Sequence, residues 1–170
     1  MPELEILTAP DPRLKTKCLP VAEVDDEIRL LMNDMLTAMY GANGIGLAAP
    51  QVNVHKRIIV IDVSPKEQER DPIRMVNPEI VEESGEQVTK EEGCLSLPDQ
   101  WADVTRPAAV TVRYMDETGK AQRLRADGVL ATCVQHEMDH LDGVLFVDHV
   151  SALKRNMILR KLQKAKKTGG

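Results

Sequence analysis

The stretch GVLATCVQHEMDHLDG at residues 128–143 predicts a helix that carries possible metal ligands. Asp127, just before it, is a residue type that commonly caps a helix N-terminus, and the final glycine is suited to end the helix. His136 and His140 are four residues apart, so on a helix both imidazoles lie on one face. The two side chains can therefore reach a single metal ion.

Glu137 directly follows the first histidine and completes the pattern H-E-x-x-H. The alternative is a surface helix with incidental histidines. The chain has only four histidines, and two of them fall in this pattern with a glutamate at the required offset. We therefore prefer the metal site. A catalytic zinc or iron centre usually has three protein ligands and one open position, so a third ligand is needed.

The third ligand does not follow the helix as it does in common H-E-x-x-H proteases. Phe146 stands where metzincin proteases carry their last histidine, and His149 is three residues too late. No glutamate follows Glu137, which excludes the thermolysin arrangement, and Asp148 lies beyond the helix in an apolar stretch. The ligand is therefore expected upstream. The candidates there are His55, Cys18 and Cys94.

Cys94 is the strongest of these candidates. It lies in EEGCLSLPD (91–99), between Gly93 and a Ser-Leu-Pro turn. The glycine permits close backbone approach, so this segment can place a thiolate against a helix. Two histidines and one cysteine form a known catalytic ligand set with an open fourth position. The alternative for a lone cysteine is a small buried apolar residue, which we expect for Cys18 and Cys133.

Hydrophobic patterning elsewhere predicts an α+β fold, with strands in the middle of the chain and helices towards both ends. Residues 25–40 have apolar positions at helical spacing, and residues 151–167 form a basic helix with one apolar stripe. The predicted strands are RIIVIDV (57–63), MVNPEIVEE (75–83), AAVTVRYMD (108–116) and AQRLRA (121–126). We expect residues 1–170 to form a single catalytic domain.

Composition limits the possible partners and compartments. The four aromatic residues are too few for a surface that stacks nucleic-acid bases, so we expect no specific DNA binding. No apolar run approaches the roughly 18 residues that a membrane span needs. The N-terminal MPELEILTAPDPRLK lacks the pattern of a signal peptide, and the three cysteines are too sparse for a disulfide scaffold. We therefore expect a cytoplasmic protein without a membrane partner.

Charge is unevenly distributed along the chain. Residues 151–170 contain seven of the 22 basic residues and none of the 27 acidic ones. A basic tail on an acidic body suggests contact with an acidic partner. From the residues alone, a solvated helix face is the simpler interpretation.

Three segments resemble the signature motifs of peptide deformylases: GIGLAAPQ (44–51), EGCLS (92–96) and QHEMDHLDG (135–143). Their order and approximate separation match as well, and the resemblance covers nearly the whole chain. It implies antiparallel β-sheets wrapped around a central helix that carries H-E-x-x-H. It also implies removal of formate from N-formylmethionine at the start of newly made bacterial-type polypeptides.

The resemblance further implies a metal held by Cys94, His136 and His140. This metal is usually Fe²⁺, and Ni²⁺, Co²⁺ or Zn²⁺ can substitute. A bound cation lowers the pKa of its water, and Glu137 would take the proton and pass it to the leaving amine. The implied oxyanion donors are the metal, the Gln51 side chain and the Leu95 backbone N–H. Residues implied to contact the peptide or its methionine side chain are Ile45, Gly46, Gly93, Val129 and Cys133.

The segment GIGLAAPQ also imitates a dinucleotide-binding fingerprint. That fingerprint should follow a strand and open a helix, whereas here it follows a predicted helix and Pro50 would interrupt the next one. We therefore expect an extended segment that lies along the peptide and ends in Gln51. Trp101 departs from the family, in which many members carry Arg or Tyr at this position, so preference beyond methionine is open.

Two other function classes remain alternatives at this point. A general metalloprotease would use the same H-E-x-x-H pattern, but this chain lacks the downstream ligand that such proteases need. A non-catalytic metal-stabilised module would normally need four protein ligands and would leave Glu137 without a role. For the basic helix 151–167, the resemblance makes docking on the ribosome a reasonable hypothesis.

Overall fold

The computed structural model describes residues 4–167, which form helices at both ends of the chain and antiparallel strands between them. The α-helices are α1 (Asp26–Gly41), α2 (Gly128–Leu141) and α3 (Ala152–Lys167), and the 3-10 helices are η1 (Pro12–Lys15), η2 (Ala49–Val52) and η3 (Phe146–His149). The strands are β1 (Gly46–Ala48), β2 (Ile58–Ile61), β3 (Ile73–Glu83), β4 (Gln87–Cys94), β5 (Leu97–Pro107), β6 (Ala109–Met115) and β7 (Ala121–Asp127).

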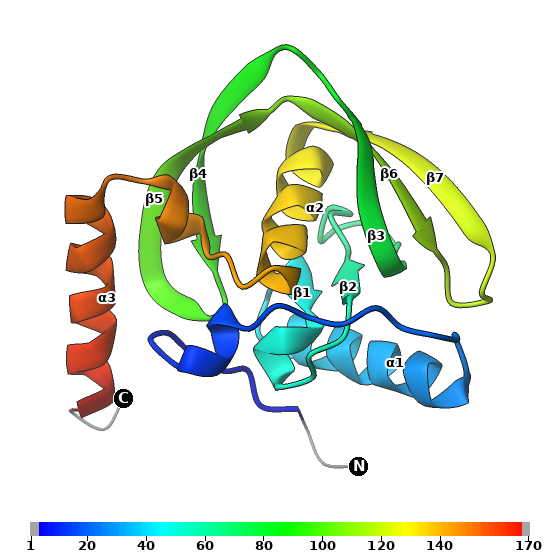
Figure 1. The fold of residues 1–170 in the computed structure, drawn as a ribbon, viewed down its shortest axis with the longest axis horizontal. Coiled ribbons are helices and arrows are strands. Elements are labelled where there is room, and N and C mark those ends of the chain that lie inside the picture. The colour runs from blue at the N-terminus through cyan, green and yellow to red at the C-terminus, as the bar shows by residue number, and fades with distance from the viewer. Residues whose placement is uncertain (1–3, 168–170) are drawn as a thin grey trace.

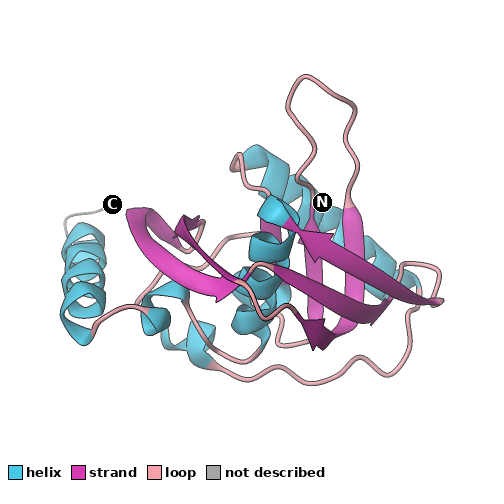
Figure 2. Ribbon diagram, turned by 90° about the horizontal axis from the view of Figure 1, so that it is seen from above, coloured by secondary structure: helices cyan, strands magenta, loops and turns pink. Residues whose placement is uncertain are grey.

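The strands form two antiparallel sheets on either side of α2. One sheet has five strands in the order β1-β2-β3-β6-β7, and the other is the β4–β5 hairpin. In Figure 1, α2 lies in the centre between the hairpin and strands β3, β6 and β7, with α1 below. Figure 2 shows the larger sheet and the hairpin on opposite sides, with α3 beyond the hairpin. This arrangement confirms the expected α+β fold around a central helix.

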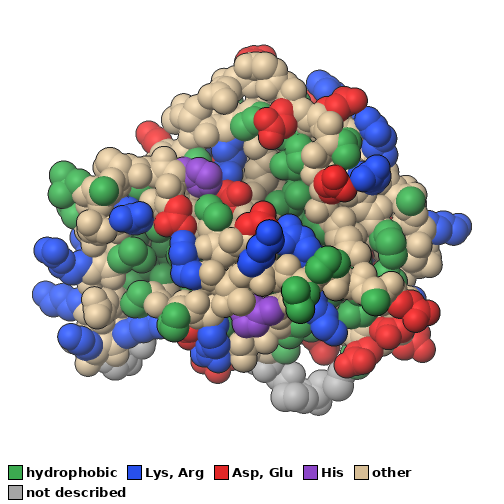
Figure 3. Space-filling view, in the orientation of Figure 1, with side chains coloured by type: hydrophobic (Ala, Val, Ile, Leu, Met, Phe, Trp, Pro, Cys, Tyr) green, Lys and Arg blue, Asp and Glu red, His purple; other side chains and the backbone are tan. Residues whose placement is uncertain are grey.

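The core is aliphatic and has three parts. The first lies between α2 and the five-stranded sheet, and the second joins α1 to β1 and β2. The third packs the β4–β5 hairpin against η3 and α3, with Ile158 and Leu162 buried on one side of α3. Phe146 is the one aromatic residue among the buried core residues of 4–167. The basic side chains of α3 are exposed or partly exposed, and Figure 3 shows Lys and Arg gathered at this edge.

The ends of α2 confirm one expectation and correct another. Gly143 ends the helix with φ +75°, and an added Cβ would lie 2.5 Å from the Lys15 carbonyl oxygen, so glycine is required there. Asp127 occupies the N-cap position, but its side chain makes no capping hydrogen bond. The predicted cap is therefore wrong. Asp127 is also the last residue of β7, where its backbone pairs with Ala109, and this pairing sets its conformation.

The segment 44–51 is extended only in part. Gly46–Ala48 form β1, which pairs with β2, but the following Ala49–Val52 form a 3-10 helix that begins at Ala49 with Pro50 in its first turn. The expectation of an extended segment to Gln51 is therefore wrong for its last three residues, because proline is well tolerated at the start of a helix. No helix among residues 4–167 is long and apolar enough to cross a membrane.

Candidate metal centre

Three predicted ligands converge between α2 and the β4–β5 hairpin. Cys94 ends β4, and His136 and His140 lie one turn apart on α2. One ligand atom from each of them lies within 4.8 Å of the other two. The Cys94 Sγ is 3.3 Å from the His140 Nε2. Cys94, the candidate preferred from the sequence, therefore lies next to both histidines.

The other candidate ligands lie elsewhere. The His55 Nε2 is 3.0 Å from the Arg13 carbonyl oxygen, on the outside of the molecule. Cys18 is buried in the core, and burial raises the pKa of its thiol to about 11. A thiol that stays protonated is a poor metal ligand. Cys18 thus follows the apolar alternative, as expected.

An ionic network behind the metal ligands orients His136. Its Nδ1 lies 3.1 Å from Glu92 Oε1, so Nε2 is the nitrogen that faces the other ligands. Arg106 binds the same carboxylate through two hydrogen bonds of 2.7 and 3.0 Å, and donates a third, of 2.9 Å, to Asp139. Asp139 in turn lies 2.7 Å from His149. The network links the metal ligand His136 to both strands of the hairpin, through Glu92 on β4 and Arg106 on β5.

Sequence reasoning did not identify this network. Burial would raise the pKa of Glu92, but hydrogen bonds from His136 and Arg106 outweigh that cost and lower the pKa to about 2. Glu92 is therefore ionised at neutral pH although it is only 5 % exposed. The one available signal was its position two residues before Cys94, since alternation along a strand buries every second side chain.

The donor set fits a divalent transition metal. Burial, together with the nearby His136, lowers the pKa of His140 well below its usual range, so this imidazole is neutral and can offer a lone pair. The His140 Nε2, which is 3.3 Å from Cys94 Sγ, is the nitrogen that faces the other ligands, while its Nδ1 is buried without a hydrogen-bond partner among residues 4–167. One thiolate and two imidazoles suit zinc, iron and related metals, and leave a fourth position open.

Glu137 points into the same space from α2. It is only 4 % exposed, and its Oε1 has no hydrogen-bond partner among the described residues. Burial raises the pKa of Glu137 to about 7. A carboxyl group with a pKa near neutrality is suited to take up and return a proton. The backbone of Gly46 lies against it, because a Cβ added there would be 2.6 Å from Glu137 Oε2.

Gln51 is held firmly by η2 beside the ligands. Its Oε1 accepts a hydrogen bond of 2.9 Å from the Ala48 N–H, and its Nε2 donates one of 3.0 Å to Ser96 Oγ. The same Nε2 lies 3.5 Å from Cys94 Sγ. Because the oxygen is occupied by backbone, the amide N–H₂ is the end that faces the site, and it can donate to a ligand oxygen.

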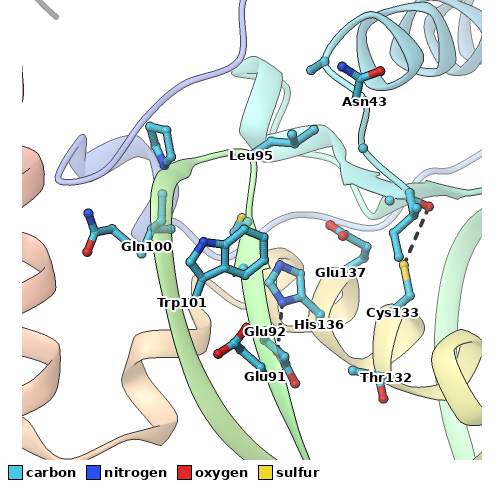
Figure 4. A pocket seen from close by; sticks show the side chains of 18 of the residues that line it. Asn43, Glu91, Glu92, Leu95, Gln100, Trp101, Thr132, Cys133, His136 and Glu137 are labelled. Carbon is cyan, nitrogen blue, oxygen red and sulfur yellow. Dashed lines mark hydrogen bonds and ion pairs between the residues drawn. The ribbon is translucent and has the colours of Figure 1, made fainter.

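A cavity of about 590 Å³ opens onto these groups. One wall comes from residues 42–46 and from α2, and the other from the β4–β5 hairpin (Figure 4). All five residues implied to contact the peptide line it: Ile45, Gly46, Gly93, Val129 and Cys133. Leu95 and Gln51 line it too, while His140 lies behind the lining and is 1 % exposed. The arrangement suits an extended ligand with an apolar group.

Comparisons with known proteins point to one family. The family model of polypeptide deformylase matches residues 3–156. A peptide deformylase of Rhizobium meliloti is 52 % identical over 97 % of this chain and 95 % of its own length. A peptide deformylase 2 of Xanthomonas campestris is 57 % identical over 96 % of both chains.

Solved structures agree in fold as well as in sequence. The crystal structure of a peptide deformylase from Ehrlichia chaffeensis superposes with a TM-score of 0.94, at 39 % identity over 99 % of both chains. A second structure of the Ehrlichia protein, in complex with actinonin, gives a TM-score of 0.92. With a family model spanning about nine-tenths of its length and relatives more than half identical along nearly all of it, this chain belongs to the polypeptide deformylase family.

Proposed function

We propose that this deformylase hydrolyses the N-formyl group of N-formylmethionine at the start of newly made polypeptides, with Glu137 as its general base. One observation carries the proposal: a buried carboxyl with an unpartnered oxygen lies beside Cys94, His136 and His140, at the end of a largely apolar cavity. A buried polar atom without a partner is rare in folded proteins, and a reacting water or amine would supply one here.

The resident metal is proposed to be Fe²⁺, with Ni²⁺, Co²⁺ or Zn²⁺ able to replace it. The ligands would be Cys94 Sγ and the Nε2 atoms of His136 and His140. When bound, the cation supplies a Lewis acid that lowers the pKa of water and polarises a carbonyl group. The mixed thiolate and imidazole set accepts several of these metals, so their availability decides which is loaded.

The chain's own residues account for the remaining steps. Glu137 takes a proton from the attacking water, whose oxygen adds to the formyl carbon. Gln51 Nε2 and the Leu95 N–H donate hydrogen bonds to the negative charge that develops on the formyl oxygen. Glu137 then delivers the proton to the amine nitrogen as the carbon–nitrogen bond breaks, which leaves formate and a free methionine amine. Ile45, Val129 and Cys133 surround the methionine side chain, and the backbones of Gly46 and Gly93 contact the peptide.

Product analysis tests the reaction type. Purified without oxygen, the protein should release formate from formyl-Met-Ala-Ser and leave Met-Ala-Ser intact. Release of free amino acids from either peptide would instead support the metalloprotease alternative, and no turnover of any peptide would support a non-catalytic metal-binding module.

Substitution of Cys94 by alanine tests the ligand set. With one of three ligands removed, Cys94→Ala should retain at least tenfold less metal after dialysis than the wild type, and formate release should fall with it. Cys18→Ala is the matched control, because it removes a buried cysteine that lies outside the site. Equal metal content in Cys94→Ala and the wild type, measured by elemental analysis, would contradict the assignment.

We further propose that the enzyme works in the cytoplasm and docks on the ribosome through α3. The helix buries Ile158 and Leu162 against the body, while its basic side chains are exposed or partly exposed on the other faces. A cationic surface of this kind is attracted to nucleic-acid phosphates, with an affinity that falls steeply as salt rises. Docking there would hold the cavity close to new polypeptides.

Charge reversal tests the docking surface better than truncation, because removing α3 would uncover the third part of the core. The triple variant Arg160→Glu/Lys161→Glu/Lys167→Glu should lose co-sedimentation with ribosomes at least tenfold at low salt. The control reverses three exposed charges elsewhere, at Lys66, Lys120 and Arg125, and should behave as the wild type does. Equal losses in the two triple variants would reject a specific role for α3.

A further inference from the structure

We propose that residues 7–9 form an N-terminal clamp that positions two groups for the reaction, the Gln51 side chain and the Leu95 backbone N–H. The inference rests on the proposed function, since it assumes that these two groups donate to the charge on the formyl oxygen. It assigns a positioning role to a segment that is not among the residues lining the cavity.

The first contact of the N-terminal clamp fixes the backbone of Gln51. The Leu7 N–H donates a hydrogen bond of 2.7 Å to the Gln51 carbonyl oxygen. Gln51 lies in η2, and the last carbonyl groups of a helix have no donor within that helix. Because Gln51 is only 1 % exposed, its carbonyl group needs a protein donor, and Leu7 supplies one. This hydrogen bond therefore holds the residue whose side chain faces the metal ligands.

The second contact fixes the turn that carries Leu95. Cys94 ends β4 and pairs with Leu97 at the start of β5, so Leu95 and Ser96 form the two-residue turn of the hairpin. The Ala9 N–H donates a hydrogen bond of 2.8 Å to the Ser96 carbonyl oxygen. The N-terminal clamp thus holds η2 with one N–H group and the hairpin turn with another.

The same two elements are also joined by side chains. Gln51 Nε2 donates a hydrogen bond of 3.0 Å to Ser96 Oγ, so η2 and the hairpin turn are connected both directly and through residues 7–9. Two separate connections restrict a rotation that one connection alone would allow. Donors to an oxyanion must lie about 2.7–3.1 Å from the position that it will occupy. A fixed separation of Gln51 and Leu95 therefore serves the chemical step.

The N-terminal clamp is itself anchored in the body of the molecule. Leu7 and Ala9 are buried and belong to the third part of the core. The carbonyl oxygen of Thr8, between them, accepts a hydrogen bond of 2.6 Å from Lys166 Nζ on α3. In Figure 1 the N-terminal segment, in dark blue, runs below the closed end of the β4–β5 hairpin. A segment held in this way can keep its two partners in place.

Substitution of Leu7 by alanine tests whether the N-terminal clamp acts on the chemical step. Leu7→Ala should lower kcat for formyl-Met-Ala-Ser by about tenfold or more, because a small displacement of a catalytic group can cost up to about 100-fold. KM should change less than about threefold, because donors that act mainly in the transition state affect kcat.

The matched control is Leu162→Ala, which removes a buried leucine from the same part of the core. It should keep kcat within about twofold of the wild type, because Leu162 lies on α3 and has no bond to η2 or to the hairpin turn among those described. Thermal unfolding gives a temperature at which both variants are folded. Elemental analysis should show equal metal content in all three proteins.

Removal of the Leu7 N–H alone is a sharper test, because it keeps every side chain. Ligation of a synthetic peptide 1–17 to residues 18–170 at Cys18 gives the full chain, with an ester oxygen in place of this N–H. The ester should lower kcat about fivefold or more relative to the all-amide ligated protein. Combined with Gln51→Ala, the same ester should lower kcat less than about twofold, because the bond then has no Gln51 side chain to position.

Several results would overturn the N-terminal clamp. Equal kcat values for the ester and all-amide proteins would do so, as would equal losses of kcat in Leu7→Ala and Leu162→Ala. An undiminished ester effect in the Gln51→Ala background would show that the hydrogen bond does not act through Gln51. If Leu7→Ala does not fold, the ester protein decides. Failure of the proposed function is separate, because then the wild type would release no formate.

Discussion

Substitution of Glu137 by glutamine is expected to lower kcat for formate release by about 10³- to 10⁴-fold, at the upper end of what general acid–base groups contribute. Glutamine has the same size and can fill the same space, but it cannot accept a proton from water or return one to the amine. The burial that raises the pKa of Glu137 to about 7 makes the native side chain suited to both transfers. The measurement is formate release at saturating formyl-Met-Ala-Ser.

Metal content and a conservative variant separate a chemical role from a structural one. Glu137→Gln should keep its metal, because Glu137 is outside the group of ligand atoms that converge. Glu137→Asp keeps the carboxylate but shortens its reach, so its activity should lie between those of Glu137→Gln and the wild type. Unchanged turnover in Glu137→Gln would leave the residue without a catalytic role and would favour the non-catalytic alternative.

The metal ligands could be predicted from local spacing along the chain and from the exclusion of other residues as ligands. His136 and His140 need only a helix to share a face, and α2 forms over the predicted residues. Elimination moved the search upstream, since Phe146 cannot bind a metal and no later glutamate exists, and the position of Cys94 between Gly93 and a Ser-Leu-Pro turn then favoured it over Cys18 and His55. Strands β2, β3, β6 and β7 were also predicted, with bounds within about two residues, because continuous or alternating apolar patterns specify them independently of the rest of the chain.

The β4–β5 hairpin could not be predicted in the same way. Strand β4 reads QVTKEEGC, which carries few apolar residues, and Pro98 and Asp99 interrupt the pattern at the start of β5. Asp99 adopts φ +62°, a left-handed conformation that strand propensities do not anticipate. The hairpin is stabilised by packing on η3 and α3, which are distant from it in sequence.

The ionic network was missed for a related reason. Arg106 and Asp139 are 33 residues apart, and each carries a charge that is usually solvated. Only the tertiary fold shows that Arg106 is 6 % exposed and bound to two carboxylates. A charged residue in a sequence does not reveal whether it is buried, so this part of the site required the structure.

Arg106→Met is the second variant with a large expected effect, and it acts on stability and on metal binding. Methionine fills similar space but leaves Glu92 buried without its cation. Removing one partner from a buried ion pair typically costs about 3–5 kcal/mol of unfolding free energy. Loss of the group that orients a metal-bound histidine typically weakens metal binding by about 10- to 100-fold. Urea unfolding and metal titration measure the two effects.

The matched control is Arg113→Met, which removes an ion pair with Glu79 in which both side chains are about 60 % exposed. Exposed pairs contribute about 0–1 kcal/mol, so this variant should stay close to the wild type. Equal losses for Arg113→Met and Arg106→Met would show that burial of the network adds nothing to stability.

The dependence on pH provides an independent check on Arg106→Met. The pKa of Glu92 is lowered from its ordinary value of 4.5 to about 2, so its contribution to folding is present above pH 4.5 and is lost as pH falls towards 2. Without Arg106 the pKa of Glu92 rises, and the variant lacks the part of this contribution that Arg106 supplies. The difference in unfolding free energy between wild type and variant, measured with chelator present, should therefore narrow from pH 7 to pH 3. A difference that stays constant over this range would mean that the guanidinium stabilises the fold by packing rather than by pairing with Glu92.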